Sequence, residues 1–372
     1  MSKLMPILLS LPLFLSAATT TTCKMCHPAI YKEYKESIHA NSSIYKDPIF
    51  NAVWKRHPLQ KKGEFKCAKC HTPNNNALIK RNTQLQPNTI QRYEPISCQN
   101  CHQIESIHKG KFMNKNIYNK KRRYFYSADV KRKGQKVFFK ETSKFFGLIK
   151  SSVGSPYHDI DYSNENYYNG NACLGCHAHK KIQNGFEVCS LEVKNSPKSK
   201  ETCISCHMPK TLGSFVNLKN TSSHANHDIS LRNDNFKELA KYIDLTLSQT
   251  ADGFQILIKN HANHALFVHP LRLGQLRISL NNHPLKVINF HRIIGNNGKA
   301  TLPWLADTVL KDTTLKAFES RTINMKYNIQ KGDSVEVTLG YYLITPKAAQ
   351  KLGITNKKLL QFRVLKRITN KF

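Results

Sequence analysis

The residues best suited to chemistry are cysteines in pairs, each pair separated by two residues and followed directly by a histidine. The pattern occurs five times and uses ten of the eleven cysteines: Cys23, Cys26 and His27; Cys67, Cys70 and His71; Cys98, Cys101 and His102; Cys173, Cys176 and His177; Cys203, Cys206 and His207. Cys-x-x-Cys-His is the attachment signature of c-type haem, with two thioether-forming thiols and a histidine on the iron. Zinc ribbons and disulfide frameworks need no histidine after each pair. The sequence therefore predicts five covalently attached haem c groups.

Each iron with a histidine on both sides needs a second imidazole, and the region around the motifs offers a surplus. The candidates for this second ligand are His39, His57, His108, His158, His179, His224 and His227. His39 lies twelve residues after His27, about 18 Å along a helix, so it would serve a different haem. His179 is too close to His177 to reach the opposite face of that haem. Iron with two histidines has no open position for substrate, which suits electron carriage.

The elements that would position these ligands change in character along the chain. Residues 28–39 have apolar side chains four apart and predict a helix that begins at a proline. From Ile243 onward, apolar and polar residues alternate in about seven short runs, including one at 358–368. This period predicts an antiparallel, immunoglobulin-like (Ig-like) sandwich at residues 240–372, which holds no cysteine. Cys189, the odd cysteine, is expected to be a buried thiol in a short strand or hairpin.

The first eighteen residues predict a secretory signal peptide. Lys3 is followed by the apolar run Leu4–Leu15 and the small residues Ser16–Ala18, the order in which such signals are built. No later segment is long enough to cross a bilayer. Export agrees with the haem prediction, since bacteria attach c-type haem outside the cytoplasm. We therefore expect the mature chain in the periplasm.

The chain is strongly basic, with a formal net charge of +33. Five haems would add roughly ten propionate charges, which leaves a positive excess. That excess favours acidic redox proteins as electron donor and acceptor, whereas export makes nucleic acid a poor partner. The mixed basic and aromatic segment 109–150 is expected to pack aromatic rings on porphyrin faces and leave lysines in water. The oligomeric state stays open.

Residues 20–230 resemble the multihaem cytochrome c family of the cytochrome c-554 type. The resemblance is carried by three stretches: Cys23 to His39, Gly147 through His158 to His177, and Cys203 through Met208-Pro209 to His224. It implies second iron ligands at His39, His158 and His224, and closely spaced haem pairs that pass electrons along a short chain. Farther on, Asn260 to Pro270 loosely resembles an Asn-x-x-x-His-x-x-Pro element that faces the haems in some relatives, which implies His264 as a ligand.

These observations together predict an α+β, multidomain chain. After the signal peptide at 1–18, a mostly helical and loop-rich multihaem cytochrome domain at 19–235 precedes the all-β, Ig-like sandwich at 240–372. The first functional hypothesis is a pentahaem electron carrier of anaerobic respiration with second ligands at His39, His57, His108, His158 and His224. The alternative is a reductase of a nitrogen or sulfur oxyanion at one five-coordinate haem, although no Cys-x-x-Cys-Lys motif occurs. A third possibility is a docking subunit whose sandwich recruits a redox enzyme.

Overall fold

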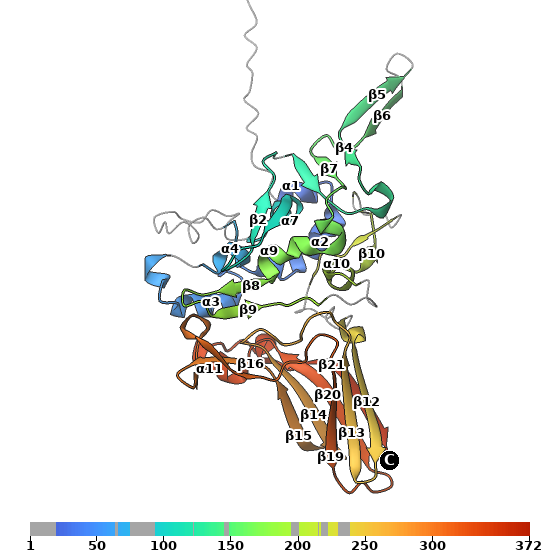
Figure 1. Cartoon of the computed structure of the whole chain (residues 1–372). Coiled ribbons are helices and arrows are strands. Elements are labelled where there is room, and N and C mark those ends of the chain that lie inside the picture. Colours follow the sequence, from blue (N-terminus) through green and yellow to red (C-terminus); the bar gives the residue numbers. More distant parts are fainter. Residues whose placement is uncertain are drawn as a thin grey trace, which may run out of the picture.

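The computed structural model describes residues 20–63, 66–74, 94–121, 123–144, 149–194, 201–214, 216, 222–229 and 239–372. The predicted signal peptide at 1–18 lies outside these residues. Figure 1 shows two parts: a haem-motif region (residues 20–229) of short helices and hairpins, and a β-rich region (residues 239–372) beneath it. Within the described residues, no helix combines the length and apolar character needed to cross a membrane.

The haem-motif region is built from short helices. Those that concern the sites are α1 (Thr20–Lys24), α2 (Pro28–Glu36), α3 (Pro48–Arg56), α4 (Ala68–His71), α7 (Cys98–His102), α8 (Asn166–Asn169), α9 (Leu174–His177) and α10 (Cys203–His207). Four motifs thus end a helix of their own, and the first makes a helical turn in which His27 N–H donates to the Cys23 carbonyl at 2.8 Å. A helical turn places residues three apart on one face, so both thiols of a motif project together.

Local capping explains where several of these helices begin and end. Ser97 with Asn100, and Thr202 with Ser205, form capping boxes that start α7 and α10. The helix predicted at 28–39 ends earlier, at Glu36. It stops because Ser37 turns to an extended conformation and its hydroxyl accepts the Ala40 N–H at 3.1 Å, which caps the next turn, His39–Asn41.

Short hairpins and a small three-stranded sheet, in which one pair of strands is parallel, connect these helices. Their strands are β1 (Ile104–His108), β2 (Lys115–Tyr118), β3 (Tyr124–Tyr126), β4 (Lys136–Val137), β5 (Lys140–Lys144), β6 (Ile149–Val153), β7 (Asp159–Asp161), β8 (His179–Lys181), β9 (Glu187–Ser190), β10 (Lys210–Leu212) and β11 (Ser223–Ala225). Cys189 lies on β9 in a hairpin, as predicted, but the expectation of a buried thiol is wrong because its side chain is exposed. Strand alternation turns the neighbouring Val188 inward instead.

The described part of the β-rich region contains three antiparallel sheets. Its strands are β12 (Ile243–Thr250), β13 (Gly253–Asn260), β14 (Leu273–Leu280), β15 (His283–Phe290), β16 (Arg292–Asn296), β17 (Lys299–Ala300), β18 (Thr308–Asp312), β19 (Ser320–Lys326), β20 (Ser334–Tyr342) and β21 (Arg363–Lys371). Two sheets have the orders β12-β13-β19 and β15-β14-β20-β21, and a smaller one has the order β17-β16-β18. Alternate side chains such as Ile256 and Val337 are fully buried in one core. The run expected at 358–368 begins as helix α12 (Lys357–Leu360), because Asn356 caps it through the Lys358 N–H.

The two regions contact each other through α3 and the β8–β9 hairpin. Ile49, Ala52 and Val53 of α3 pack against the core of the β-rich region. The Arg56 guanidinium donates to the Leu352 carbonyl at 3.0 Å, at the end of helix α11 (Pro346–Leu352). Arg292 donates to the carbonyls of β9, with Glu187 at 2.8 Å. The β-rich region is therefore fastened to the haem-motif region at more than one place.

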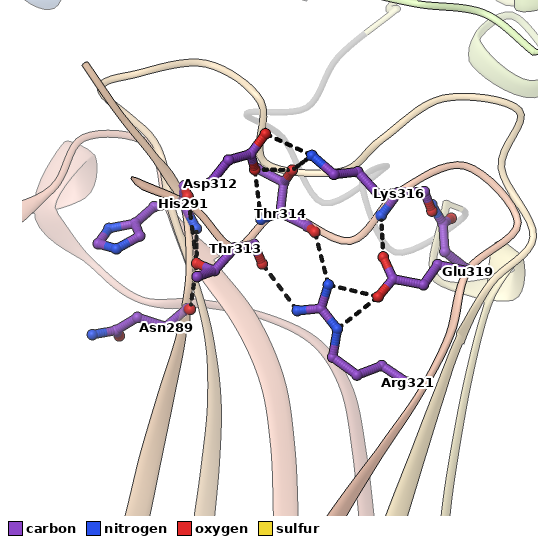
Figure 2. A network of polar contacts seen from close by, with 9 residues as sticks. Asn289, His291, Asp312, Thr313, Thr314, Lys316, Glu319 and Arg321 are labelled. Carbon is purple, nitrogen blue, oxygen red and sulfur yellow. Dashed lines mark hydrogen bonds and ion pairs between the residues drawn. The ribbon is translucent and has the colours of Figure 1, made fainter. Parts of the chain in front are cut away.

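A polar network fixes the loop between β18 and β19 (Figure 2). Arg321 donates to the backbone carbonyls of Thr313 and Thr314 at 3.0 and 2.9 Å and pairs with the Glu319 carboxylate. Asp312 accepts the Thr314 N–H at 3.0 Å. These hydrogen bonds and the ion pair hold the loop in one conformation beside the neighbouring segment 260–266.

Candidate haem-binding sites

The donors at each motif fit the attachment of haem c. All eleven cysteines have free thiols, so no disulfide competes for the ten that belong to motifs. In each motif the helical turn brings the two thiols to one side and the histidine directly after them. Two thiols and one imidazole are the groups that haem c needs for its two thioethers and its first protein ligand to iron.

Four motif histidines face a second histidine across a constant gap. The ring centroids are separated by 6.0 Å for His27 and His158, 6.0 Å for His177 and His39, 6.1 Å for His102 and His227, and 6.1 Å for His207 and His264. A metal–imidazole bond is about 2 Å long, so two nitrogens on opposite sides of one ion lie about 4 Å apart. Each ring centroid lies roughly 1 Å behind its nitrogen, which gives about 6 Å between centroids. The four pairs have the spacing that one shared iron requires.

Backbone carbonyls orient several of these rings. The Nδ1–H groups donate to carbonyls as follows: His102 to Tyr126 at 2.8 Å, His227 to Ala225 at 2.7 Å and His264 to Ala265 at 3.0 Å. A hydrogen on Nδ1 leaves the lone pair on Nε2, and metal-binding histidines commonly have such a partner on the other nitrogen. The three rings are therefore held in the tautomer that binds a metal through Nε2.

Burial keeps these imidazoles in the form that binds metals. Desolvation, reinforced by neighbouring histidines, lowers the pKa of His39 and of His207 to about 4. The same causes lower the pKa of His227 to about 3. Desolvation by neighbouring groups also lowers the pKa of His177. Neutral imidazole, with a free lone pair, is the metal ligand.

Among the second ligands considered from sequence, the structure brings His39, His158, His227 and His264 to motif histidines. His158 also lies 5.2 Å from the Phe125 ring, centroid to centroid. His57 lies elsewhere, between the rings of Trp54 at 6.3 Å and Trp304 at 5.0 Å. His108 is exposed at the end of β1. The described contacts of His57 and His108 thus place neither opposite a motif histidine.

His224 is near a site, but its ring is directed to other groups. Its Nδ1 lies 2.7 Å from the Gly213 carbonyl and its Nε2 2.9 Å from the Glu33 carboxylate. Both ring nitrogens are thus directed to oxygen atoms of the protein and not to a motif histidine. His227, three residues farther on, faces His102 instead. The sequence supplied both histidines but gave no local signal to choose between them.

The second motif has different surroundings. The His71 ring stacks on Phe50 of α3, with centroids 4.6 Å apart. His269 of the β-rich region has an exposed side chain, and desolvation by neighbouring groups, the charge of Arg272 and the proximity of His71 lower its pKa to about 3. The Leu271 N–H donates to His269 Nδ1 at 3.2 Å. Sequence reasoning missed His269, which has no motif around it beyond the following proline.

The loop that carries His264 is fixed by a buried side chain. Asn260 is fully buried, and its amide donates to the His264 carbonyl at 3.1 Å and to the Lys316 carbonyl at 2.8 Å. Its oxygen accepts the Ala262 N–H at 3.0 Å. Lys316 belongs to the loop of Figure 2. The β-rich region therefore holds His264 through Asn260 and the polar network behind it.

Thiol contacts show which motifs are neighbours. Interaction of Cys23 with Cys98, of Cys70 with Cys176 and of Cys203 with Cys173 raises the pKa of one thiol of each pair, namely Cys98, Cys176 and Cys173. The Cys101 thiol of the third motif also acts electrostatically on Cys173 and Cys176 of the fourth. In space, the order is therefore first, third, fourth, with the second and fifth motifs both beside the fourth.

Comparison with known proteins bears on the same residues. Residues 22–103, which contain the first three motifs, match the family model of cytochrome c554 and c-prime. The fold is similar to the crystal structure of a penta-heme cytochrome c552 from Thermochromatium tepidum, with a TM-score of 0.71 over 96% of this chain and 99% of that chain. These findings support the multihaem cytochrome c family. At 18% identity the structural likeness is one of fold. No curated protein matches the chain.

Proposed function

We propose that the chain is a periplasmic pentahaem c-type cytochrome that carries electrons in a respiratory chain through haems with two histidine ligands. The observation that carries this proposal is the set of four imidazole pairs with centroids 6.0 to 6.1 Å apart. Haem c, once attached, supplies one-electron chemistry at its iron. The residues attach, orient and enclose that group, and two imidazoles per iron leave no position for a substrate.

The residues proposed to bind each haem follow from the geometry of each motif. The ten motif cysteines would form the thioethers of five haems. The ligand pairs would be His27 with His158 in the first site, His102 with His227 in the third, His177 with His39 in the fourth and His207 with His264 in the fifth. For the second site, we propose His269 as the candidate partner of His71, because it lies close enough to His71 for that ring to lower its pKa.

The packing of motifs supports a continuous route for electrons. The first motif adjoins the third through Cys23 and Cys98, and the third adjoins the fourth through the proximity of Cys101 to Cys173. The second and fifth motifs branch from the fourth. We propose that electrons pass between adjoining motifs in this order. They would enter or leave at the outer motifs, which are the first, the second and the fifth.

We also propose the domain limits and the location. The haem-motif region would correspond to a cytochrome domain at 19–235, and the β-rich region to a sandwich at 240–372. The orders β12-β13-β19 and β15-β14-β20-β21, all antiparallel, support an Ig-like arrangement of three strands against four. Residues 1–18 would be a signal peptide that directs the chain to the periplasm. The net charge of +33 supports acidic redox proteins as partners.

The proposal is tested on the purified mature chain by mass spectrometry and by electron paramagnetic resonance (EPR) of its oxidised form. The expected mass is that of the chain plus five haem c groups, with all five irons low-spin. A mass equal to the bare chain would refute covalent haem. A high-spin iron that binds cyanide or nitrite would refute the pure carrier.

One observation favours the reductase as second candidate, and it concerns the second site. The Leu271 N–H donates to His269 Nδ1, which places the hydrogen of a neutral ring on Nε2, the nitrogen that would have to bind iron. A site with such a partner could admit a small nitrogen or sulfur oxyanion. Replacement His269→Ala separates the two functions. The carrier predicts a new high-spin iron in the variant, whereas the reductase predicts one already present in the natural chain.

A further inference from the structure

Glu33 of α2 makes two hydrogen bonds to the segment that bears His227. One carboxylate oxygen accepts from His224 Nε2 at 2.9 Å, and the other accepts the backbone N–H of His227 at 2.9 Å. The other side of His224 is fixed by the Gly213 carbonyl at 2.7 Å. The His224 side chain is only 5% exposed and that of Glu33 21%, so water competes little for these bonds. Hydrogen bonds to an ionised carboxylate are roughly twice as strong as neutral ones.

The segment after β11 needs such support. His227 lies in a loop two residues beyond the end of β11, outside the β10–β11 ladder. Two residues later, Ile229 has a φ of 45°, a left-handed conformation that β-branched residues rarely adopt. Strained conformations of this kind persist only where surrounding contacts enforce them. The Glu33 contact is one of those that bind this loop to the rest of the chain.

We propose that Glu33 is a positioning residue that holds His227 opposite His102. Glu33 lies on α2, the helix that follows the first motif, so α2 fixes the position of His227, the proposed second ligand of the third site. This inference rests on the proposed pair of His102 and His227. The helix starts directly after His27, and the first and third motifs touch through Cys23 and Cys98. One nine-residue helix thus supports the ligand spheres of two neighbouring sites.

The test compares Glu33→Ala with Glu36→Ala, which removes an exposed carboxylate from the same helix. Both variants are loaded with haem, checked by mass, oxidised and measured by EPR. Glu33→Ala should convert one of the five haems from low-spin to high-spin in a substantial fraction of molecules, and added imidazole should restore the low-spin signal. Glu36→Ala should match the natural chain. An unchanged Glu33→Ala spectrum, or an equal change in Glu36→Ala, would overturn the proposal.

A second and milder variant covers the case in which Glu33→Ala does not accumulate with haem. Glu33→Gln keeps an oxygen that can accept the His227 N–H but loses the charge. It should give a smaller high-spin fraction at the same haem, and an unchanged spectrum would overturn the proposal.

His227→Ala separates this inference from the function on which it rests. If His227→Ala produces one high-spin haem and the Glu33 variants do not, only the role of Glu33 fails. If His227→Ala leaves every haem low-spin, the ligand pair itself fails and the role of Glu33 falls with it. If the high-spin signals of His227→Ala and Glu33→Ala appear at the same position in the EPR spectrum, both changes act on one iron.

Discussion

At the scale of single residues, the local and distant parts of each site differ in how far sequence can predict them. The thiol pairs and their histidines are contiguous, so five attachment sites can be read from spacing alone. The second ligands come from far along the chain and depend on packing. His224 and His227 illustrate this, since a hydrogen bond to Glu33, 191 residues away, occupies one and frees the other to face His102.

A pair of histidine replacements tests the assignment of the first site. His158→Ala should create one high-spin haem, because the ring that faces His27 at 6.0 Å is removed. His108→Ala, in which an exposed ring on β1 is lost, should leave the EPR spectrum unchanged. The opposite pattern, with an effect only from His108, would remove the first ligand pair from the proposal.

At the scale of elements, alternation and capping account for much of the structure. The alternation of apolar and polar residues predicted the strands of the β-rich region, because one face of each strand lies in a common core. It failed at 358–362, where Asn356 caps a short helix. The hairpins of the haem-motif region were largely missed, since two- to five-residue strands such as β4 and β5 are too short to show a period.

The loop that carries His264 provides a prediction at this scale. Asn260→Ala would leave the His264 and Lys316 carbonyls without the amide that donates to them. A buried group left unsatisfied costs about 1–3 kcal/mol. We expect the free energy of unfolding in denaturant to fall by about that amount, and a high-spin signal from the fifth site.

The matched control is Asn328→Ala, which changes an exposed asparagine after β19. It should alter neither stability nor spectrum. If Asn260→Ala lowered stability but left every haem low-spin, Asn260 would support the fold without positioning His264.

At the scale of the whole molecule, composition predicted a basic exported protein of two parts, and the structure shows how the parts depend on each other. The β-rich region was expected as a cap or docking surface. Its histidines His264 and His269 instead approach the fifth and second motifs. The resemblance of Asn260 to Pro270 had pointed to His264, whereas nothing in the sequence pointed to His269, which does not lie near a cysteine in the chain.

The charge of the whole chain predicts how its reactions respond to salt. With a net charge of +33, association with an acidic electron carrier should be fast at low ionic strength and slow as salt shortens the Debye length. Stopped-flow reduction of the oxidised protein by reduced flavodoxin as the acidic probe, measured from low to high salt, should show this decline. A cationic redox dye should show the opposite trend, and equal trends for both would argue against electrostatic docking.

The two tryptophans of the chain, Trp54 and Trp304, lie on either side of His57, one from each region. Trp54 also belongs to a buried cluster with Phe50 and Ala68, against which Cys67 of the second motif packs. Every indole that could fluoresce is thus at the seam between the regions and next to an attachment site for an absorbing pigment. Tryptophan fluorescence should be almost fully quenched in the intact holoprotein and should rise as soon as the two regions separate. The fluorescence therefore reports on this junction.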